Sequence, residues 1–162
     1  MRKSADSLTK LSAWVETPAG PVAMRELAGQ VSEILLLPEP ETVQWTPLGR
    51  RFEAQLVRYL QSGRADFELP LLAQGTAFQQ RVWARLAELP RGETVSYGEL
   101  ARELGTVARA LGQACRHNPH PIVVPCHLVL SASGMGGFSG QTGGAMLDFK
   151  QWLLNHEGAG RD

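Results

Sequence analysis

Two short helical segments between Ser96 and Arg116 constrain the fold of this chain more than any other stretch of its sequence. Ser96 stands three residues before Glu99, the spacing of a capping box, in which each side chain binds the backbone amide of the other residue. Gly105 is suited to the end of the first segment, because glycine readily adopts the left-handed conformation of a helix C-terminus. A second segment follows from Ala108 after a short turn. The pair predicts a helix-turn-helix.

The first half of the chain predicts a small sheet with one helix. A turn rich in proline and glycine separates two strand-like segments, and a third apolar segment ends at Pro38. Apolar residues then recur at three- and four-residue spacing in a stretch that Gly63 is suited to end. The expected elements are strands at 12–15, 22–25 and 31–37 and a helix at 47–62, followed by a connection at 65–75.

The second half begins with another capping box, formed by Thr76 and Gln79. The helix that starts there is expected to close at Pro90-Arg91-Gly92, and the apolar run Ile122-Val123-Val124 predicts a short strand. We therefore expect an α+β fold. Its parts are an N-terminal sheet-and-helix domain at 1–75 and a mostly helical domain at 76–162, whose last helix spans 147–156.

Composition favours a globular intracellular protein. Hydrophobic residues make up 43% of the chain and charged residues 20%, and the formal net charge is zero. These values argue against disorder and against a strongly basic nucleic-acid binder, but they leave room for a local DNA-binding surface. The apolar run Ile34–Leu37 is too short to span a bilayer, and the first residues show no secretory signal. We expect a cytoplasmic location.

Two cysteines are too few for a disulfide framework, so one of them is a candidate for reactive chemistry and the other for a buried apolar role. Pro125-Cys126-His127 pairs a thiol with an imidazole that can take its proton, and Glu157 is the best candidate to orient that imidazole. A buried structural cysteine remains the simpler alternative. Zinc binding by Cys115, His117, Cys126 and His127 is disfavoured, because no paired Cys-x2-Cys spacing exists.

The second helix of the predicted helix-turn-helix carries Arg109 among small residues, namely Ala108, Ala110, Gly112 and Ala114. Small side chains let a helix approach a nucleic acid backbone closely, and an arginine among them is placed to replace a displaced base. A solvated arginine or a surface salt bridge explains the same pattern. Tyr97 and the glycine-rich loop around Phe138-Ser139-Gly140 have structural alternatives too, as a core tyrosine and a flexible connector.

These motifs, in this order, resemble the O6-alkylguanine-DNA alkyltransferases, also called methylated-DNA–protein-cysteine methyltransferases. The resemblance covers about residues 76–158, roughly half of the chain. The N-terminal half resembles the family only in its general character. It rests on Ser96-Tyr97, Ala108-Arg109-Ala110-Leu111-Gly112, Asn118-Pro119, Ile122-Val123-Val124-Pro125-Cys126-His127, the Gly-Phe-Ser-Gly loop at 137–140 and Leu153-Leu154-Asn155-His156-Glu157-Gly158.

The resemblance implies a single-turnover repair reaction on double-stranded DNA that contains O6-alkylguanine, with no cofactor and no metal. Cys126 would accept the alkyl group, with a water and His127 as its base. Glu157 would orient His127, Asn118 would support the network, and Tyr97 would hold the flipped nucleotide and protonate the leaving guanine. The other implied contacts are Arg109, Ala108, Ala110, Gly112 and Ser96 for DNA, and Ser139, Val129, Phe138, Gly140 and the Cys126 carbonyl for the base.

Two departures from the family pattern bear on these expectations. Leu128 stands where the family usually has arginine after Pro-Cys-His, which puts rate and stability in question more than reaction type. The glycine-rich loop looks longer than in many relatives, which puts substrate range in question. Three other functions compete: a damage sensor that binds alkylguanine without transfer, a helix-turn-helix regulator, and a thiol hydrolase. A monomer is expected, and cooperative assembly on DNA stays open.

Overall fold

The computed structural model describes residues 10–64, 66–131 and 144–158. The chain divides into two compact units, Met1–Leu72 and Ala73–Asp162. Each unit buries its own set of apolar side chains: Leu11, Val22, Met24, Phe52, Leu56 and Tyr59 in the first, and Val82, Leu86, Leu100, Leu111, Leu128, Phe149 and Leu153 in the second.

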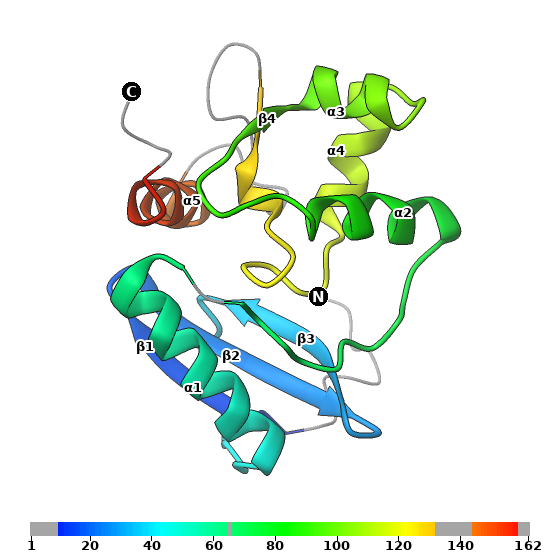
Figure 1. The fold of residues 1–162 in the computed structure, drawn as a ribbon. Coiled ribbons are helices and arrows are strands. Elements are labelled where there is room, and N and C mark those ends of the chain that lie inside the picture. Colours follow the sequence, from blue (N-terminus) through cyan, green and yellow to red (C-terminus); the bar gives the residue numbers. More distant parts are fainter. Residues whose placement is uncertain (1–9, 65, 132–143, 159–162) are drawn as a thin grey trace. The chain divides into compact units, whose positions relative to one another are not determined.

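The first unit contains the predicted three-stranded sheet (Figure 1). Its strands are β1 at Ala13–Thr17, β2 at Gly20–Leu27 and β3 at Gln30–Leu36, and they pair antiparallel in the order β1-β2-β3. Such neighbours need only short turns, here Pro18-Ala19 before β2 and Ala28-Gly29 before β3. The three predicted strands are confirmed, each with ends shifted by a few residues.

One helix, α1 at Pro47–Ser62, packs against β1 and β2 (Figure 1). The Thr46 side chain accepts a hydrogen bond from the amide of Gly49 and so caps the helix start, and Gly63 ends the helix at a φ of 74°. A side chain at Gly49 would collide with the chain entering β1, because its Cβ would lie 1.9 Å from the Ser12 carbonyl oxygen. The predicted helix 47–62 is confirmed.

Four helices form most of the second unit: α2 at Ala77–Leu86, α3 at Tyr97–Glu103, α4 at Ala108–Arg116 and α5 at Ala145–His156. Both predicted capping boxes are present, Thr76 with Gln79 and Ser96 with Glu99. Gly105 follows α3 at a φ of 69°, and α4 packs against both α2 and α3. The predicted helix-turn-helix therefore corresponds to α3 and α4.

The expected strand at Ile122–Val124 is wrong. This segment is a turn, and Ile122 has a φ of 74°, far from extended backbone. Pro121 and Pro125 flank it, and neither has the amide hydrogen that a strand ladder needs. The chain instead forms the one-turn 3-10 helix η2 at Cys126–Leu128. It then enters β5 at Val129–Leu130, which pairs in parallel with β4 at Val95–Ser96.

The end of α2 also differs from expectation, because the helix stops at Leu86 rather than at Pro90. The next residues continue in tight i to i+3 hydrogen bonds, from the amide of Glu88 to Arg85 and from that of Leu89 to Leu86. This tightening is common in a final helical turn. In the described part of the chain, none of the helices combines the length and apolar character needed to cross a bilayer.

Replacing Thr76 by alanine should lower the free energy of unfolding by about 1 kcal/mol, because the α2 capping box loses its side-chain acceptor. Urea unfolding followed by circular dichroism measures this loss. Thr94→Ala is the matched control, since Thr94 is exposed and caps no helix. An equal loss in both variants would contradict the capping role.

Candidate active site

Cys126 is the first residue of η2 and is only 4% exposed. Its amide donates to the Val124 carbonyl at 2.8 Å, and its carbonyl accepts from the amide of Val129. Burial raises the pKa of the thiol, because a thiolate loses its hydration there. A hydrogen bond from the Asn118 side chain and the positive charge of Lys150 act in the opposite direction and favour the thiolate.

His127 and Glu157 form a fully buried pair next to this thiol. His127 Nε2 lies 2.7 Å from Glu157 Oε2, and both side chains are 0% exposed. Burial lowers the pKa of His127, although the hydrogen bond and charge of Glu157 counteract part of that effect. Within the described residues, Nδ1 has no hydrogen-bond partner. A neutral His127 with its proton on Nε2 would therefore present Nδ1 as a base.

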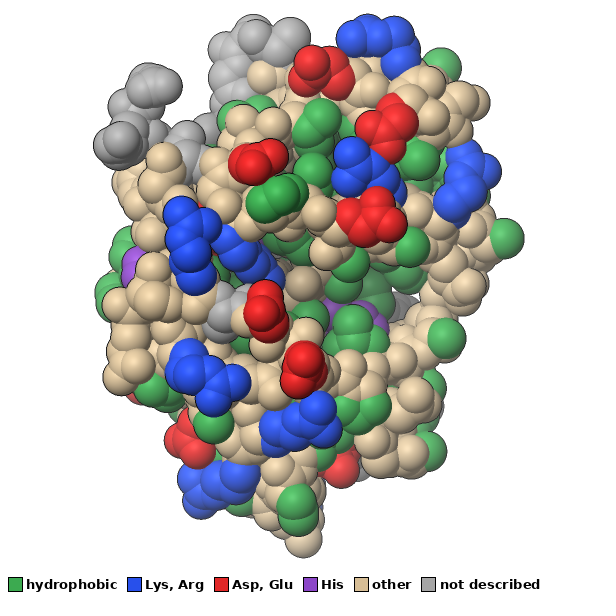
Figure 2. Space-filling model, viewed as in Figure 1, with side chains coloured by type: hydrophobic (Ala, Val, Ile, Leu, Met, Phe, Trp, Pro, Cys, Tyr) green, Lys and Arg blue, Asp and Glu red, His purple; other side chains and the backbone are tan. Residues whose placement is uncertain are grey.

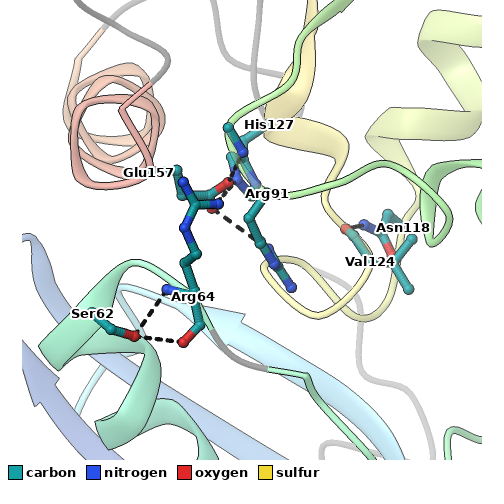
Figure 3. A network of polar contacts seen from close by, with 8 residues as sticks. Ser62, Arg64, Arg91, Asn118, Val124, His127 and Glu157 are labelled. Carbon is teal, nitrogen blue, oxygen red and sulfur yellow. Dashed lines mark hydrogen bonds and ion pairs between the residues drawn. The ribbon is translucent and has the colours of Figure 1, made fainter.

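Asn118 braces the turn that leads to the thiol. Its side-chain amide donates to the Val124 carbonyl at 2.8 Å, and its Oδ1 accepts from the amide of His120 at 2.9 Å. Figure 3 shows the bond to Val124 on the loop that leads into η2. Because this loop has no strand ladder, a side-chain brace of this kind fixes the backbone just before Cys126.

The turn that contains Arg91 and Gly92 contacts Glu157 twice, although the sequence motifs gave this turn no role at the site. The Gly92 amide donates to Glu157 Oε1 at 3.0 Å, and Arg91 Nη1 lies 3.5 Å from Glu157 Oε2 (Figure 3). Gly92 has a φ of 86°, and a Cβ there would lie 2.6 Å from the Glu157 carbonyl oxygen. The turn therefore needs glycine for both its conformation and its close approach.

Tyr97 begins α3 directly after β4, and the pairing of β4 with β5 links its segment to the chain that follows η2. Its side chain is half-buried. Burial raises the pKa of the Tyr97 hydroxyl, and negative charge on Cys115 or Cys126 would raise it further. Tyr97 is consequently a proton donor rather than a phenolate near neutral pH. Ser96 caps the helix beneath it through the amide of Glu99 at 3.0 Å.

Lys150 is a further residue near the candidate site that the sequence motifs did not indicate. It is 0% exposed, and its Nζ donates to the Val129 carbonyl at 3.0 Å. Burial lowers the pKa of Lys150 to about 8, although negative charge on Cys126 and Cys115 would raise it. The sequence could have predicted this burial. Lys150 precedes Leu153, Leu154 and Glu157 at helical spacing and so lies on the inward face of α5.

Helix α4 presents the predicted DNA-binding residues unevenly. Arg109 and Ala108 are exposed, whereas Ala110 and Gly112 are half-buried. Ala114, expected on the same surface, is 2% exposed and belongs to the core, because it lies on the face that packs against α2 and α3. Val107, which precedes α4, is 65% exposed, and its side chain does not cap the helix.

Charges around these helices are mixed rather than segregated. Figure 2 shows acidic and basic side chains interspersed on the visible face of the second unit. Arg85 of α2, for example, pairs with Glu103 of α3 and with Glu88. On this face of the second unit, the interspersed charges give no broad field for phosphate binding.

The remaining predicted residues fall into two groups. Phe138, Ser139 and Gly140 lie outside the described residues, whereas Val129 is fully buried directly after η2. Cys115 is buried in α4, as expected of an apolar cysteine. Among residues 10–64, 66–131 and 144–158, no three histidine, cysteine or acidic side chains gather as metal ligands would.

Comparison with known proteins adds independent evidence. A family model described as the DNA-binding domain of 6-O-methylguanine DNA methyltransferase matches residues 77–159. The methylated-DNA–protein-cysteine methyltransferase of Mycobacterium tuberculosis is 39% identical over 135 residues, which cover 78% of this chain and 82% of that protein. The crystal structure of Mycobacterium tuberculosis OGT in complex with DNA aligns with a TM-score of 0.74 at 35% identity, over 91% of this chain and 92% of that one.

A protein of Thermus thermophilus described as a DNA base-flipping protein is also similar, with 38% identity over 90% of this chain and 99% of that protein. The resemblance that the sequence motifs indicated is confirmed by the family model and by relatives that match both halves of the chain. This chain belongs to the family of methylated-DNA–protein-cysteine methyltransferases.

Proposed function

We propose that this chain repairs DNA directly, by transferring the alkyl group of O6-alkylguanine in double-stranded DNA irreversibly to the sulfur of its own Cys126. The observation that carries the proposal is the buried arrangement of Cys126, His127 and Glu157, with 2.7 Å between the imidazole and the carboxylate. A structural cysteine needs no neighbouring base, whereas a nucleophilic thiol does.

The reaction is a substitution at the alkyl carbon. His127 Nδ1 takes the thiol proton through a bridging water, and the thiolate sulfur attacks the carbon bound to O6 of guanine. The new sulfur–carbon bond forms as the carbon–oxygen bond breaks, and its electron pair stays on guanine. The Tyr97 hydroxyl, whose raised pKa keeps it protonated, then supplies a proton to the leaving base. The product is a thioether, so each molecule reacts once.

Neighbouring residues prepare the thiol for this step. Asn118 braces the backbone before Cys126 and also hydrogen-bonds the thiolate, which offsets part of the cost of burying that charge. Glu157 holds His127 in the tautomer that leaves Nδ1 free to accept. The buried charge of Lys150 favours the thiolate as well. Together these contacts offset an environment that by itself raises the thiol pKa.

The alkylated nucleotide has to flip out of the duplex, because O6 is inaccessible within the stack and the proposed acceptor thiol is buried. We assign Arg109 to the space that the flipped nucleotide leaves. Ala108, Ala110 and Gly112 let α4 approach the minor groove, with Ser96 at the start of α3. Val129, Ser139, Phe138 and Gly140, with the Cys126 carbonyl, would line the pocket for the base.

Binding without transfer is the main alternative, and the Thermus thermophilus base-flipping protein makes it relevant. Cys126 and its buried base argue against that alternative, because a sensor has no use for an activated thiol. A plain helix-turn-helix regulator leaves the same residues unexplained. We place the protein in the cytoplasm as a monomer without cofactor, where reducing conditions keep the acceptor thiol free.

Incubation with a duplex containing O6-methylguanine should increase the mass of the protein by one methyl group, about 14 Da, located on Cys126 by peptide mapping. Cys126→Ser should abolish the gain and keep DNA binding, whereas Cys115→Ser should keep the gain. Transfer by Cys126→Ser would refute the nucleophile assignment. Binding by the wild-type protein without any gain in mass would favour the damage sensor.

Arg109→Ala should slow methyl transfer from duplex DNA by roughly tenfold or more, because the flipped state loses a side chain that offsets a few kcal/mol of unstacking. Reaction with free O6-benzylguanine should change less than twofold, since no base has to be flipped. Arg58→Ala removes another exposed arginine, from α1, and serves as the control. Equal losses on both substrates would refute the role of Arg109 in base flipping.

Lys150→Met should alter how stability depends on pH. The pKa of Lys150 is about 8 in the folded chain against an ordinary 10.5, so the unfolded chain binds more protons between these values. The buried lysine therefore lowers the free energy of unfolding as pH falls from 10.5 to 8. Below pH 8 this destabilisation has reached its full size.

Unfolding free energies of wild type and Lys150→Met, measured between pH 7 and 10.5, test this linkage. The variant's advantage over wild type should be larger at pH 7 than at pH 10.5 by up to about 3 kcal/mol. Lys10→Met, at an exposed lysine, should show no such trend. A constant difference for Lys150→Met would contradict the lowered pKa.

A further inference from the structure

Arg91 lies against the buried carboxylate of the candidate active site but belongs to none of the motifs that identify the family. Its Nη1 is 3.5 Å from Glu157 Oε2, and its side chain is 13% exposed while that of Glu157 is fully buried. It reaches this position from the turn after α2, where the adjacent Gly92 amide binds the other carboxylate oxygen at 3.0 Å. Figure 3 shows Arg91 and His127 both directed at Glu157.

The two contacts offset the cost of burying the Glu157 carboxylate. An ionised carboxylate without solvent costs several kcal/mol unless charges or hydrogen-bond donors replace the lost water. If that cost were not offset, Glu157 would take up a proton, or His127 would become an imidazolium to balance it. A protonated imidazole cannot accept the proton of a thiol. The chemistry therefore requires Glu157 charged and His127 neutral together.

A guanidinium beside Glu157 favours this combination. Its positive charge stabilises the carboxylate at short range and opposes a second positive charge on His127. The position after Pro-Cys-His contributes no charge, because Leu128 stands there and is fully buried. Among the described residues, the other charged groups that act on His127 are Glu157 and Lys150, both from the α5 segment, whereas Arg91 comes from the turn after α2.

We propose that Arg91 is a positioning residue for alkyl transfer: its guanidinium holds Glu157 as a carboxylate and keeps His127 neutral, so that Nδ1 can take the proton of Cys126. This inference rests on the proposed function, because it concerns how the acceptor thiol is activated. Arg91 touches neither the sulfur nor the alkyl group, and it acts only through Glu157 and His127.

The test compares Arg91→Met and Arg91→Lys with wild type in single-turnover methyl transfer from duplex DNA between pH 5.5 and 9. Methionine keeps the apolar volume and removes the charge, whereas lysine keeps the charge. Arg50→Met is the control, because Arg50 forms an exposed ion pair with Glu53 on α1. Thermal unfolding of each variant accompanies the rates.

Loss of the guanidinium should raise the pKa of His127, so the acid limb of the rate profile should move up by about one pH unit in Arg91→Met. At a pH on that limb, transfer should slow by about tenfold. Arg91→Lys should restore the limb to within a few tenths of a unit, and Arg50→Met should leave it unchanged. A lowered melting temperature with an unmoved acid limb would mean that Arg91 only stabilises the fold, and would overturn the proposal.

A DNA-free measurement separates this proposal from the proposed function. Alkylation of Cys126 by iodoacetamide, with Cys126→Ser as the blank, reports thiol activation without any repair substrate. If wild type accepts no methyl group from DNA, the proposed function fails, and the iodoacetamide profile still decides whether Arg91 controls the protonation of His127. If Arg91→Met matches wild type in both profiles, the inference about Arg91 is wrong.

Discussion

The buried hydrogen bond between His127 and Glu157 is the interaction on which the rest of the candidate active site depends. It spans 2.7 Å with both side chains removed from water. Burial of this kind is unfavourable for a lone charge, so the fold has to surround the pair with donors and positive charge. The Gly92 amide supplies a donor and Arg91 supplies positive charge, both from the turn after α2.

The thiol is positioned by backbone geometry more than by side-chain pairing. Prolines on both sides of the turn prevent a strand, and η2 places Cys126 and His127 on consecutive positions of a tight helical turn. The parallel pairing of β4 with β5 then links this turn to α3, which begins at Tyr97. One short stretch of sheet thereby connects the proposed acceptor thiol, the proposed proton donor and the helix-turn-helix.

Much of the fold was predictable because its signals are local. Capping boxes at Thr76 and Ser96 and the glycine after α1 marked helix ends, and the three strands of the first unit followed from turn residues and apolar runs. The strand expected at Ile122–Val124 failed because an apolar run alone does not report the positive φ of Ile122. The surface role expected of Ala114 failed because alanine fits both a crowded interface and an exposed helix.

The sequence by itself determined the family and the helix-turn-helix, and it predicted the thiol, imidazole and carboxylate of the candidate site, because short motifs in a fixed order carry those features. Only the tertiary structure decided that Arg91 and Gly92 reach Glu157 across more than sixty residues of chain, and that Lys150 is buried beside Val129. The reason is physical. Charge stabilisation in a buried site depends on distance through space and on lost hydration, and neither is encoded by spacing along the chain.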